Sequence, residues 1–211
     1  VLAAQGLSEV WSAPFVSDER HTALGYSAED ARARTVALAN PLSDEAPLMR
    51  ISILSTLVDS LRRNIARGAS DVGLFEVGLV VALDGPQRKA PTIDVGLQPE
   101  PELLAEIRAA VPAQPRHLGF LLAGMRERAG WWGDGRVADL ADAIAVAQSI
   151  TDALALPVTV SADQTAMPFH PGRCARLSLA DGTLVGHVGE LHPKVTVALG
   201  LPSIAYTEGR C

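Results

Sequence analysis

Two groups of residues in this chain have the chemistry to bind a ligand or a metal ion. The first is an arginine, Arg50, and a glutamate, Glu76, which lie on either side of an amphipathic stretch. An arginine offers a planar fork of N–H donors that suits a phosphate or a carboxylate. The second group holds His170, Glu190 and His192. Two imidazoles and one carboxylate can form a ligand set for a divalent transition metal.

Arg50 has two interpretations. It can be a ligand-binding or interface residue, or it can be a partly buried structural arginine that pairs with a carboxylate such as Glu76. The structural interpretation is favoured, because arginine commonly fills such roles in folded proteins.

The histidine group is not expected to bind a metal. Its members lack the tight spacing of metal-ligand motifs, and each histidine precedes a proline, in His170-Pro171 and His192-Pro193. The residue before a proline is biased toward extended or turn backbone. Both histidines are therefore predicted to serve in turns or helix caps.

Other notable residues have plain structural interpretations. Cys174 lies in a predicted strand and is expected to be a small core thiol rather than a nucleophile. Gly189, like Gly186, is expected to mark a bulge or close packing rather than a ligand site. Trp131 and Trp132 lie in a predicted polar loop at 126–135, where they either anchor a partner or pack against the loop.

The stretch from Asn40 to Leu83 positions the first group. Asn40-Pro41 predicts a turn. A helix is predicted from Leu54 to Gly68, where the glycine suits a left-handed cap. Residues 75–83 alternate in a pattern typical of a strand with a packed face. The helical face is indicated by apolar residues at the expected spacing, namely Leu54, Leu57, Val58, Leu61 and Ile65.

The rest of the chain predicts further strands and helices. Strands are expected at 9–16, 36–39, 117–124 and 157–161, and as a hairpin at 173–190 that turns at Asp181-Gly182. Helices are expected at 100–110, 137–154 and 193–200, the last of which begins at a proline. Fourteen prolines are present, and a proline-rich stretch predicts a surface insertion at about 84–116. The pattern favours one α+β domain over 1–211, with an antiparallel sheet of mixed edge flanked by helices.

Composition narrows the function classes. The chain has 211 residues, a formal net charge of −6 and no run of more than two Lys or Arg residues, so no broad surface for nucleic acid is indicated. Two cysteines are too few for a disulfide framework, and a cytoplasmic location is expected. No apolar run reaches the roughly 18–20 residues of a membrane helix, so no membrane partner is expected. The chain opens on Val1 rather than Met, and we expect it to be a piece of a longer protein.

Several motifs, spread from one end of the chain to the other, resemble the β chain of bacterial phenylalanine–tRNA ligase in its synthetase-like core. They occur in the order of that family, and together they are far more specific than any one alone. The motifs are GLSEVWSAPFVS (6–17), NPLSDEAPLMRISIL (40–54) followed by RRN (62–64) and LFEVG (74–78), FHPGRCARL (169–177) and GHVGELHP (186–193).

The resemblance implies the antiparallel sheet of class II aminoacyl-tRNA synthetases and an (αβ)2 heterotetramer. In that assembly the α chain is the catalytic partner, ATP and Mg²⁺ are used by the holoenzyme and not bound by this segment, and tRNA binds the holoenzyme. Positions in the matching motifs become structural or interface candidates. These are Asn40, Pro41, Arg50, Asn64, Phe75, Glu76, Gly78, His170, Pro171, Gly172, Gly189, Glu190, His192 and Pro193.

The segment itself is expected to lack catalysis. The resemblance implies two catalytic motifs in active synthetases of this class. One is an Arg-x-Glu pattern just after a strand, and the other is a glycine-rich segment that ends in arginine. Here the strand reaches Asp84-Gly85-Pro86 without the first pattern, and no glycine-rich segment ending in an arginine follows Pro193. The resemblance thus predicts a non-catalytic core that supports assembly. The alternative is a stand-alone relative that binds an adenylate or an amino acid.

Overall fold

The computed structural model describes residues 1–27, 29–83, 85–201 and 207–209. Asp84 and Cys211, which figured in the sequence predictions, lie outside the described residues. The helices are α1 (Asp18–Ala23), α2 (Ile53–Ala66), α3 (Pro101–Ala110), α4 (Leu140–Ala153) and α5 (Pro193–Ala198), with single 3-10 turns η1 (Ala3–Gln5) and η2 (Ala31–Ala33). The strands are β1 (Ser8–Glu9), β2 (Phe15–Val16), β3 (Leu48–Met49), β4 (Val72–Leu79), β5 (Arg116–Ala123), β6 (Met125–Glu127), β7 (Arg136–Val137), β8 (Thr159–Ala162), β9 (Phe169–Ser178), β10 (Leu184–Leu191) and β11 (Thr207–Gly209).

A seven-stranded sheet organises the molecule, in the order β1-β4-β5-β11-β10-β9-β8. β1 runs parallel to β4, and every other neighbouring pair is antiparallel. The predicted α+β fold, with its antiparallel sheet and mixed edge, is therefore confirmed. β2 pairs with β3 and β6 with β7, outside the main sheet.

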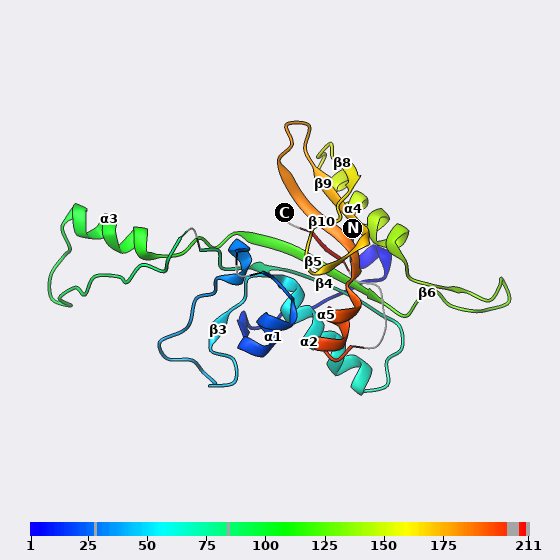
Figure 1. The fold of residues 1–211 in the computed structure, drawn as a ribbon, viewed down its shortest axis with the longest axis horizontal. Coiled ribbons are helices and arrows are strands. Elements are labelled where there is room, and N and C mark those ends of the chain that lie inside the picture. Colours follow the sequence, from blue (N-terminus) through cyan, green and yellow to red (C-terminus); the bar gives the residue numbers. More distant parts are fainter. Residues whose placement is uncertain (28, 84, 202–206, 210–211) are drawn as a thin grey trace.

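Helices cover both faces of this sheet. In Figure 1, α1, α2 and α5 lie below the sheet, and α4 runs alongside β8, β9 and β10 and covers the other face, which we call the upper face. The lower core is dominated by α2, whose Ile53, Leu54, Leu57, Val58 and Leu61 are completely buried. The upper core joins α4 to β5, β9 and β10 and includes the fully buried Phe120.

The sequence sets both ends of α2, and the predicted left-handed cap at Gly68 is confirmed. The Ser52 side chain accepts a hydrogen bond from the Leu54 N–H, which caps the first turn. At the other end Gly68 has φ +93°, a left-handed conformation that glycine adopts without a Cβ penalty. The N–H groups of residues 68 and 69 bond back to the carbonyls of residues 65 and 64, which forms a Schellman motif.

Two predicted strands differ from the structure. The single strand expected at 9–16 is two short strands, β1 and β2, in different sheets. Its second half pairs with β3 because the Arg50 N–H bonds to the Pro14 carbonyl. The strand expected at 36–39 is reduced to an isolated bridge between Ala37 and Leu48.

The strand predicted at 75–83 is also displaced. β4 begins at Val72 and ends at Leu79. Within it Glu76 is 1% exposed, whereas Val77 and Leu79 are 39% and 44% exposed. This difference in exposure comes from tertiary packing. Helix α2 covers the face of β4 that carries Glu76, whereas Val77 and Leu79 remain open on the opposite face.

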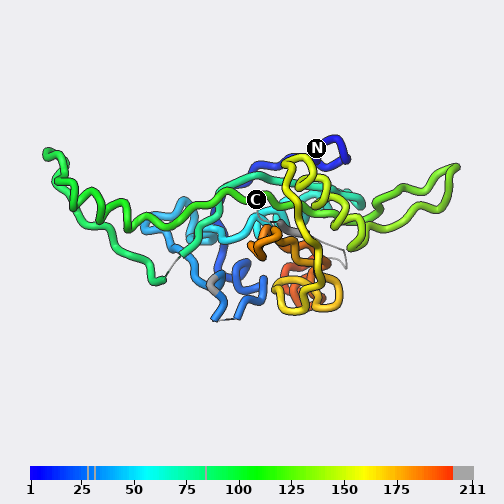
Figure 2. The backbone as a smooth tube through the Cα atoms, turned by 90° about the horizontal axis from the view of Figure 1, so that it is seen from above, coloured from blue at the N-terminus to red at the C-terminus, as the bar shows by residue number. Residues whose placement is uncertain are grey.

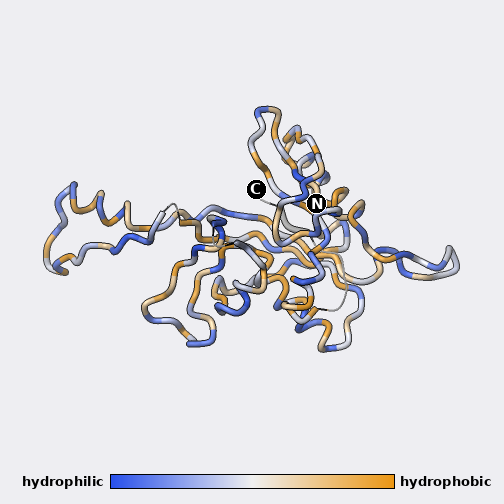
Figure 3. The backbone as a smooth tube through the Cα atoms, viewed as in Figure 1, coloured by the Kyte–Doolittle hydropathy of each residue, from blue (hydrophilic) through white to orange (hydrophobic). Residues whose placement is uncertain are grey.

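Two arms project from the body in opposite directions (Figures 1 and 2). Residues 85–115, between β4 and β5, form the longer arm and carry α3, which has no buried residue. The other arm is the β6–β7 hairpin, where a polar loop was predicted. Figure 3 shows that this hairpin is largely hydrophilic, whereas apolar residues run through the centre of the body. Among the described residues no helix is both long and apolar enough to cross a bilayer.

Candidate functional site

Arg50 and Glu76 form a closed ion pair beneath the sheet. The Arg50 Nη1 lies 2.6 Å from the Glu76 Oε1, and the two side chains are 3% and 2% exposed. Nη1 also donates to the Thr56 hydroxyl at 2.8 Å, and Nε donates to the Leu79 carbonyl at 3.0 Å. The pairing favoured from the sequence is thus present, and it is fully rather than partly buried.

The space around this pair is filled by neighbouring side chains. The Arg50 guanidinium occupies the position that a Cβ on Gly78 would take. On the next strand, a Cβ on Gly119 would lie 2.8 Å from the Cγ2 of Ile53. Glycine therefore lets α2 and Arg50 approach the sheet closely. These are packing contacts, and they leave the Arg50 side chain almost no exposed surface for a phosphate group.

The two histidines of the second group stack on each other. The rings of His170 and His192 are 6.0 Å apart and inclined by 25°. Each Nδ1 accepts a backbone N–H two residues on, from Gly172 and from Lys194. His192 is the N-cap of α5, which Pro193 begins. The predicted cap role of His192 is confirmed, whereas His170 lies within strand β9 and not in a turn.

Glu190 does not join the histidines. Its carboxylate is 2.6 Å from the Nε of Arg173, across the β9–β10 pair. Within the described residues no group of three or more His, Cys, Asp or Glu side chains is arranged to hold a metal ion. Gly189 faces Cys174 at a register shift, and a Cβ there would lie 2.6 Å from the Arg173 carbonyl, so this glycine serves a bulge as predicted.

The remaining candidates lie apart from both groups. Asn40 and Pro41 are in the exposed loop before β3. Asn64 is near the end of α2 and donates to the Ser60 carbonyl at 2.9 Å. Phe75 is 9% exposed and packs in the upper core, on the face of the sheet opposite Glu76. Pro171 is exposed in β9 beside Gly172.

Cys174 is an inert core thiol. It is 5% exposed in the lower core, and burial, assisted by the charge of Asp163, raises its pKa to about 12. Asp163 itself lies 3.0 Å from the Nε2 of His187. The backbone N–H of Thr165 holds the pKa of Asp163 below its ordinary value, and burial lowers the pKa of His187.

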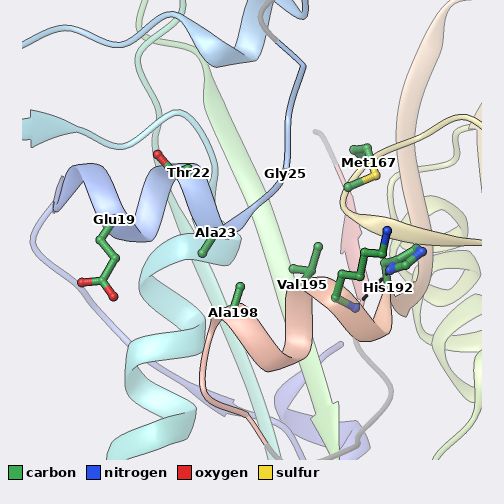
Figure 4. A pocket seen from close by; sticks show the side chains of 9 residues that line it. Glu19, Thr22, Ala23, Gly25, Met167, His192, Val195 and Ala198 are labelled. Carbon is green, nitrogen blue, oxygen red and sulfur yellow. Dashed lines mark hydrogen bonds between the residues drawn. The ribbon is translucent and has the colours of Figure 1, made fainter.

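A groove of about 700 Å³ lies between α1 and α5. Figure 4 shows Glu19 of α1 at one end and His192 at the other, and Lys194, the residue after Pro193, also lines the groove. Apolar side chains line the stretch between the two ends, and these belong to Ala23, Val195 and Ala198. The volume is typical of small-molecule sites, and the groove has charged groups to orient a ligand.

An apolar strip also lies open on the upper face. Val77 and Leu79 point away from α2, and Trp11, which follows β1, is 88% exposed. The Val10 N–H bonds to the Phe75 carbonyl, which carries the chain alongside β4 up to Trp11. We call Trp11, Val77 and Leu79 the exposed strand strip. Exposed apolar residues that gather in this way mark interaction surfaces.

Sequence reasoning missed two contributors to these sites. Thr56 completes the Arg50 cluster, and its signal was the i, i+4 spacing of Ser52, the N-cap of α2, with Thr56 and Ser60 on one face of the helix. All three are buried. The pairing of Asp163 with His187 joins residues 24 apart and had no local signal.

Comparison with known proteins identifies relatives over nearly the whole chain. Residues 1–208 match the family model described as the phenylalanyl-tRNA synthetase beta chain CLM domain. The chain is 48% identical over 207 residues to the phenylalanine–tRNA ligase beta subunit of Thermobifida fusca, and 44% identical over 205 residues to that of Streptomyces avermitilis. Each alignment covers 96% of this chain but only 25% and 24% of the relative, so the chain spans about a quarter of their length.

One solved structure supports the fold alone. It is a pyrrolysyl-tRNA synthetase from Desulfitobacterium hafniense, with a TM-score of 0.62 and 10% sequence identity. The match covers 99% of this chain and 61% of the other, so the class II synthetase-like fold extends over the described residues.

Proposed function

This chain belongs to the family of phenylalanyl-tRNA synthetase β chain CLM domains, and on that premise we propose that it is a non-catalytic core that holds the α chain of phenylalanine–tRNA ligase. The assembly is an (αβ)2 heterotetramer in the cytoplasm. Its α chain uses ATP and Mg²⁺ to attach phenylalanine to tRNA.

The observation that carries the proposal is that the Arg50–Glu76 ion pair is buried and that its guanidinium is already hydrogen-bonded within the domain. A synthetase needs an arginine free to stabilise phosphate charge. Here the guanidinium already bonds to a carboxylate, a hydroxyl and a carbonyl, and Arg50 is only 2% exposed. These residues do not fit an ATP–Mg²⁺ site. The scaffold contributes its surface to the ligase, and the chemistry belongs to the partner.

The exposed strand strip supplies a surface for that partner. Trp11, Val77 and Leu79 present apolar area on an ordered sheet, and aromatic residues are enriched in the cores of interfaces. Covering such area removes it from water, which is the main favourable term in protein association.

Co-purification tests this assignment. The full-length β chain is expressed with its matching α chain, and retention of α on tagged β is measured. The variant Val77→Glu/Leu79→Glu is expected to lose most of the α chain, because it places two charges in the apolar contact. Leu42→Glu is the matched control, since Leu42 is 90% exposed but lies in a loop. Full retention of α by the double variant would show that the strip is not part of the interface. Failure of wild-type β to bind α would refute the proposed function.

A second candidate function rests on the groove between α1 and α5, where a stand-alone relative would bind an adenylate or an amino acid. The Lys194 ammonium would pair with the carboxylate of an amino acid or the phosphate of an adenylate, and the apolar side chains beside it would contact the rest of the ligand. Calorimetric titration with ATP and with phenylalanine separates the two functions. Saturable micromolar binding that Lys194→Met abolishes would favour this alternative over the assembly role.

A further inference from the structure

The β6–β7 hairpin places two tryptophans at the tip of the shorter arm. Gly130 and Gly133 exchange backbone hydrogen bonds of 2.9 and 3.0 Å, so Trp131 and Trp132 are the two loop residues between them. Figures 1 and 2 show this hairpin projecting away from the body. Trp131 is 95% exposed and Trp132 is 65% exposed. The alternative of ordinary loop packing is therefore wrong for Trp131.

The tip is organised before any partner binds. The indole Nε1 of Trp132 donates to the Arg128 carbonyl at 3.1 Å. Its ring lies against Gly130, where an added Cβ would come within 2.7 Å of it. Trp131 then stands against Trp132 in an edge-to-face arrangement, with the rings 5.9 Å apart and inclined by 79°. Trp132 is thus held in place in the free protein and gives Trp131 a fixed ring to pack against, which reduces the entropy lost on binding.

The base of the hairpin is tied to α4. Arg136 donates from both terminal nitrogens to the two carboxylate oxygens of Asp142, each at 2.6 Å, and from Nε to Glu127 at 2.8 Å. Asp142 and Asp139 form the capping box of α4. The Met125 N–H also bonds to Asp71 at 2.8 Å. The base of the hairpin is therefore fixed to the body of the domain.

The charges of the hairpin favour a protein over a nucleic acid as the occupant. Arg136 is paired with Asp142 and Glu127, Arg126 lies 3.9 Å from Asp142, and Arg128 lies 3.6 Å from Asp71. Binding to a phosphate backbone relies on cations that can neutralise phosphates. These arginines already have carboxylates beside them, and the whole chain carries a net charge of −6. Two indoles with neutralised surroundings suit an apolar pocket.

The surface area of the tip indicates what kind of protein partner it can bind. Each tryptophan can bury about 150–250 Å², so the pair supplies at most about 500 Å². A stable interface takes roughly 800 Å² per partner. The tip cannot hold a free partner alone, but it can anchor a subunit that other surfaces of the chain already hold.

We infer that the Trp131–Trp132 tip is a second anchor for the α chain, inserting into an apolar pocket on that subunit. The inference rests on the proposed function, because it takes the α chain as the partner. The indole N–H of Trp131, for which the described residues provide no hydrogen-bond acceptor, would bond to a carbonyl or carboxylate at the rim of the pocket.

Site-directed crosslinking in the assembled ligase tests the inference directly. The variant Trp131→benzoylphenylalanine is made in the full β chain, assembled with α, and illuminated with and without tRNA. A crosslink to the α chain is expected under both conditions. The same substitution at Leu42 is the control and should give none. A crosslink to tRNA, or no crosslink at position 131, overturns the inference.

Assembly affinity provides the second measurement. Trp131→Ala should raise the α–β dissociation constant at least tenfold on dilution, and Trp131→Phe should retain part of the affinity. The high exposure of Trp131 means that both variants keep the fold, which circular dichroism checks. Unchanged affinity in Trp131→Ala contradicts the inference. If wild-type β itself does not retain α, the proposed function has failed, and that result is known before any variant is compared.

Discussion

The guanidinium group of Arg50 lies against the α-carbon of Gly78, in the space that a side chain at position 78 would need. Glycine at position 78, in the FEVG motif, thus leaves room for the Arg50 guanidinium to reach Glu76, which lies two residues earlier in β4. A larger residue would have to push the arginine away from Glu76. In this chain, the motif residues Arg50, Glu76 and Gly78 therefore pack against one another in the core.

Gly78→Ala is expected to lower the free energy of unfolding by about 2–3 kcal/mol, because the added methyl group overpacks a filled site. Urea denaturation measures the change. Gly96→Ala is the control, since Gly96 has a negative φ and only the flexible Asp94 side chain near it, at 3.8 Å. The control should change stability by less than about 0.5 kcal/mol. Equal effects in the two variants would contradict this account of Gly78.

Arg50→Met is expected to cost about 3–5 kcal/mol, because it leaves the Glu76 carboxylate buried without its partner. Adding Glu76→Leu should restore a large part of that loss, since the second change removes the unpaired charge. A double-mutant cycle of unfolding free energies measures the coupling. Strictly additive effects would show that the two side chains do not interact energetically.

The Asp163–His187 pair predicts loss of stability in acid. Burial lowers the folded-state pKa of His187 below its ordinary value of 6.5, so the unfolded chain binds more protons between 6.5 and that lower pKa. Stability should therefore fall as the pH drops below about 6.5. Asp163, whose pKa lies below 3.8, adds a second loss as the pH falls through its folded-state value.

The variant His187→Gln checks the first part of that loss. Glutamine can still donate to Asp163 but does not titrate, so the slope of unfolding free energy against pH should flatten between pH 6.5 and 5. An unchanged slope would assign the acid sensitivity to other groups.

Cys174 is expected to resist alkylation in the folded protein. Burial raises the pKa of its thiol to about 12 and encloses it in the core, so at pH 8 almost no thiolate is available to react. In a Cys211→Ser background, iodoacetamide should label the chain only in denaturant, as followed by mass spectrometry. Rapid labelling of the native protein would contradict the buried placement.

Local patterns predicted the elements whose signals lie within a few residues. The helix that ends at Gly68 and the hairpin that turns at Asp181-Gly182 both follow from backbone chemistry at the glycine. The helix beginning at Pro193 likewise needs only its first residue and the preceding cap. These features were found where they were expected.

Tertiary contacts decided the parts that the sequence could not predict. Alternation along β4 did not reveal that Glu76 faces the core while Val77 and Leu79 face outward, because that choice depends on which helix covers which face. The Trp131–Trp132 tip depends on hydrogen bonds between two glycines that flank it. In the candidate site the pairing of Arg50 with Glu76 was foreseen, but the fully buried network with Thr56 was not.

The position of β11 has a consequence for how the chain folds as it is made. β11 comes last among the described strands, yet it lies between β5 and β10 in the sheet. The hydrogen-bonded ladder that connects β1-β4-β5 to β10-β9-β8 is therefore complete only once residues 207–209 are in place. Until then the edges of β5 and β10 expose unpaired backbone groups, and the pairing that closes them spans a long sequence distance. Until β11 pairs, the sheet therefore has two open edges at its centre instead of one continuous ladder.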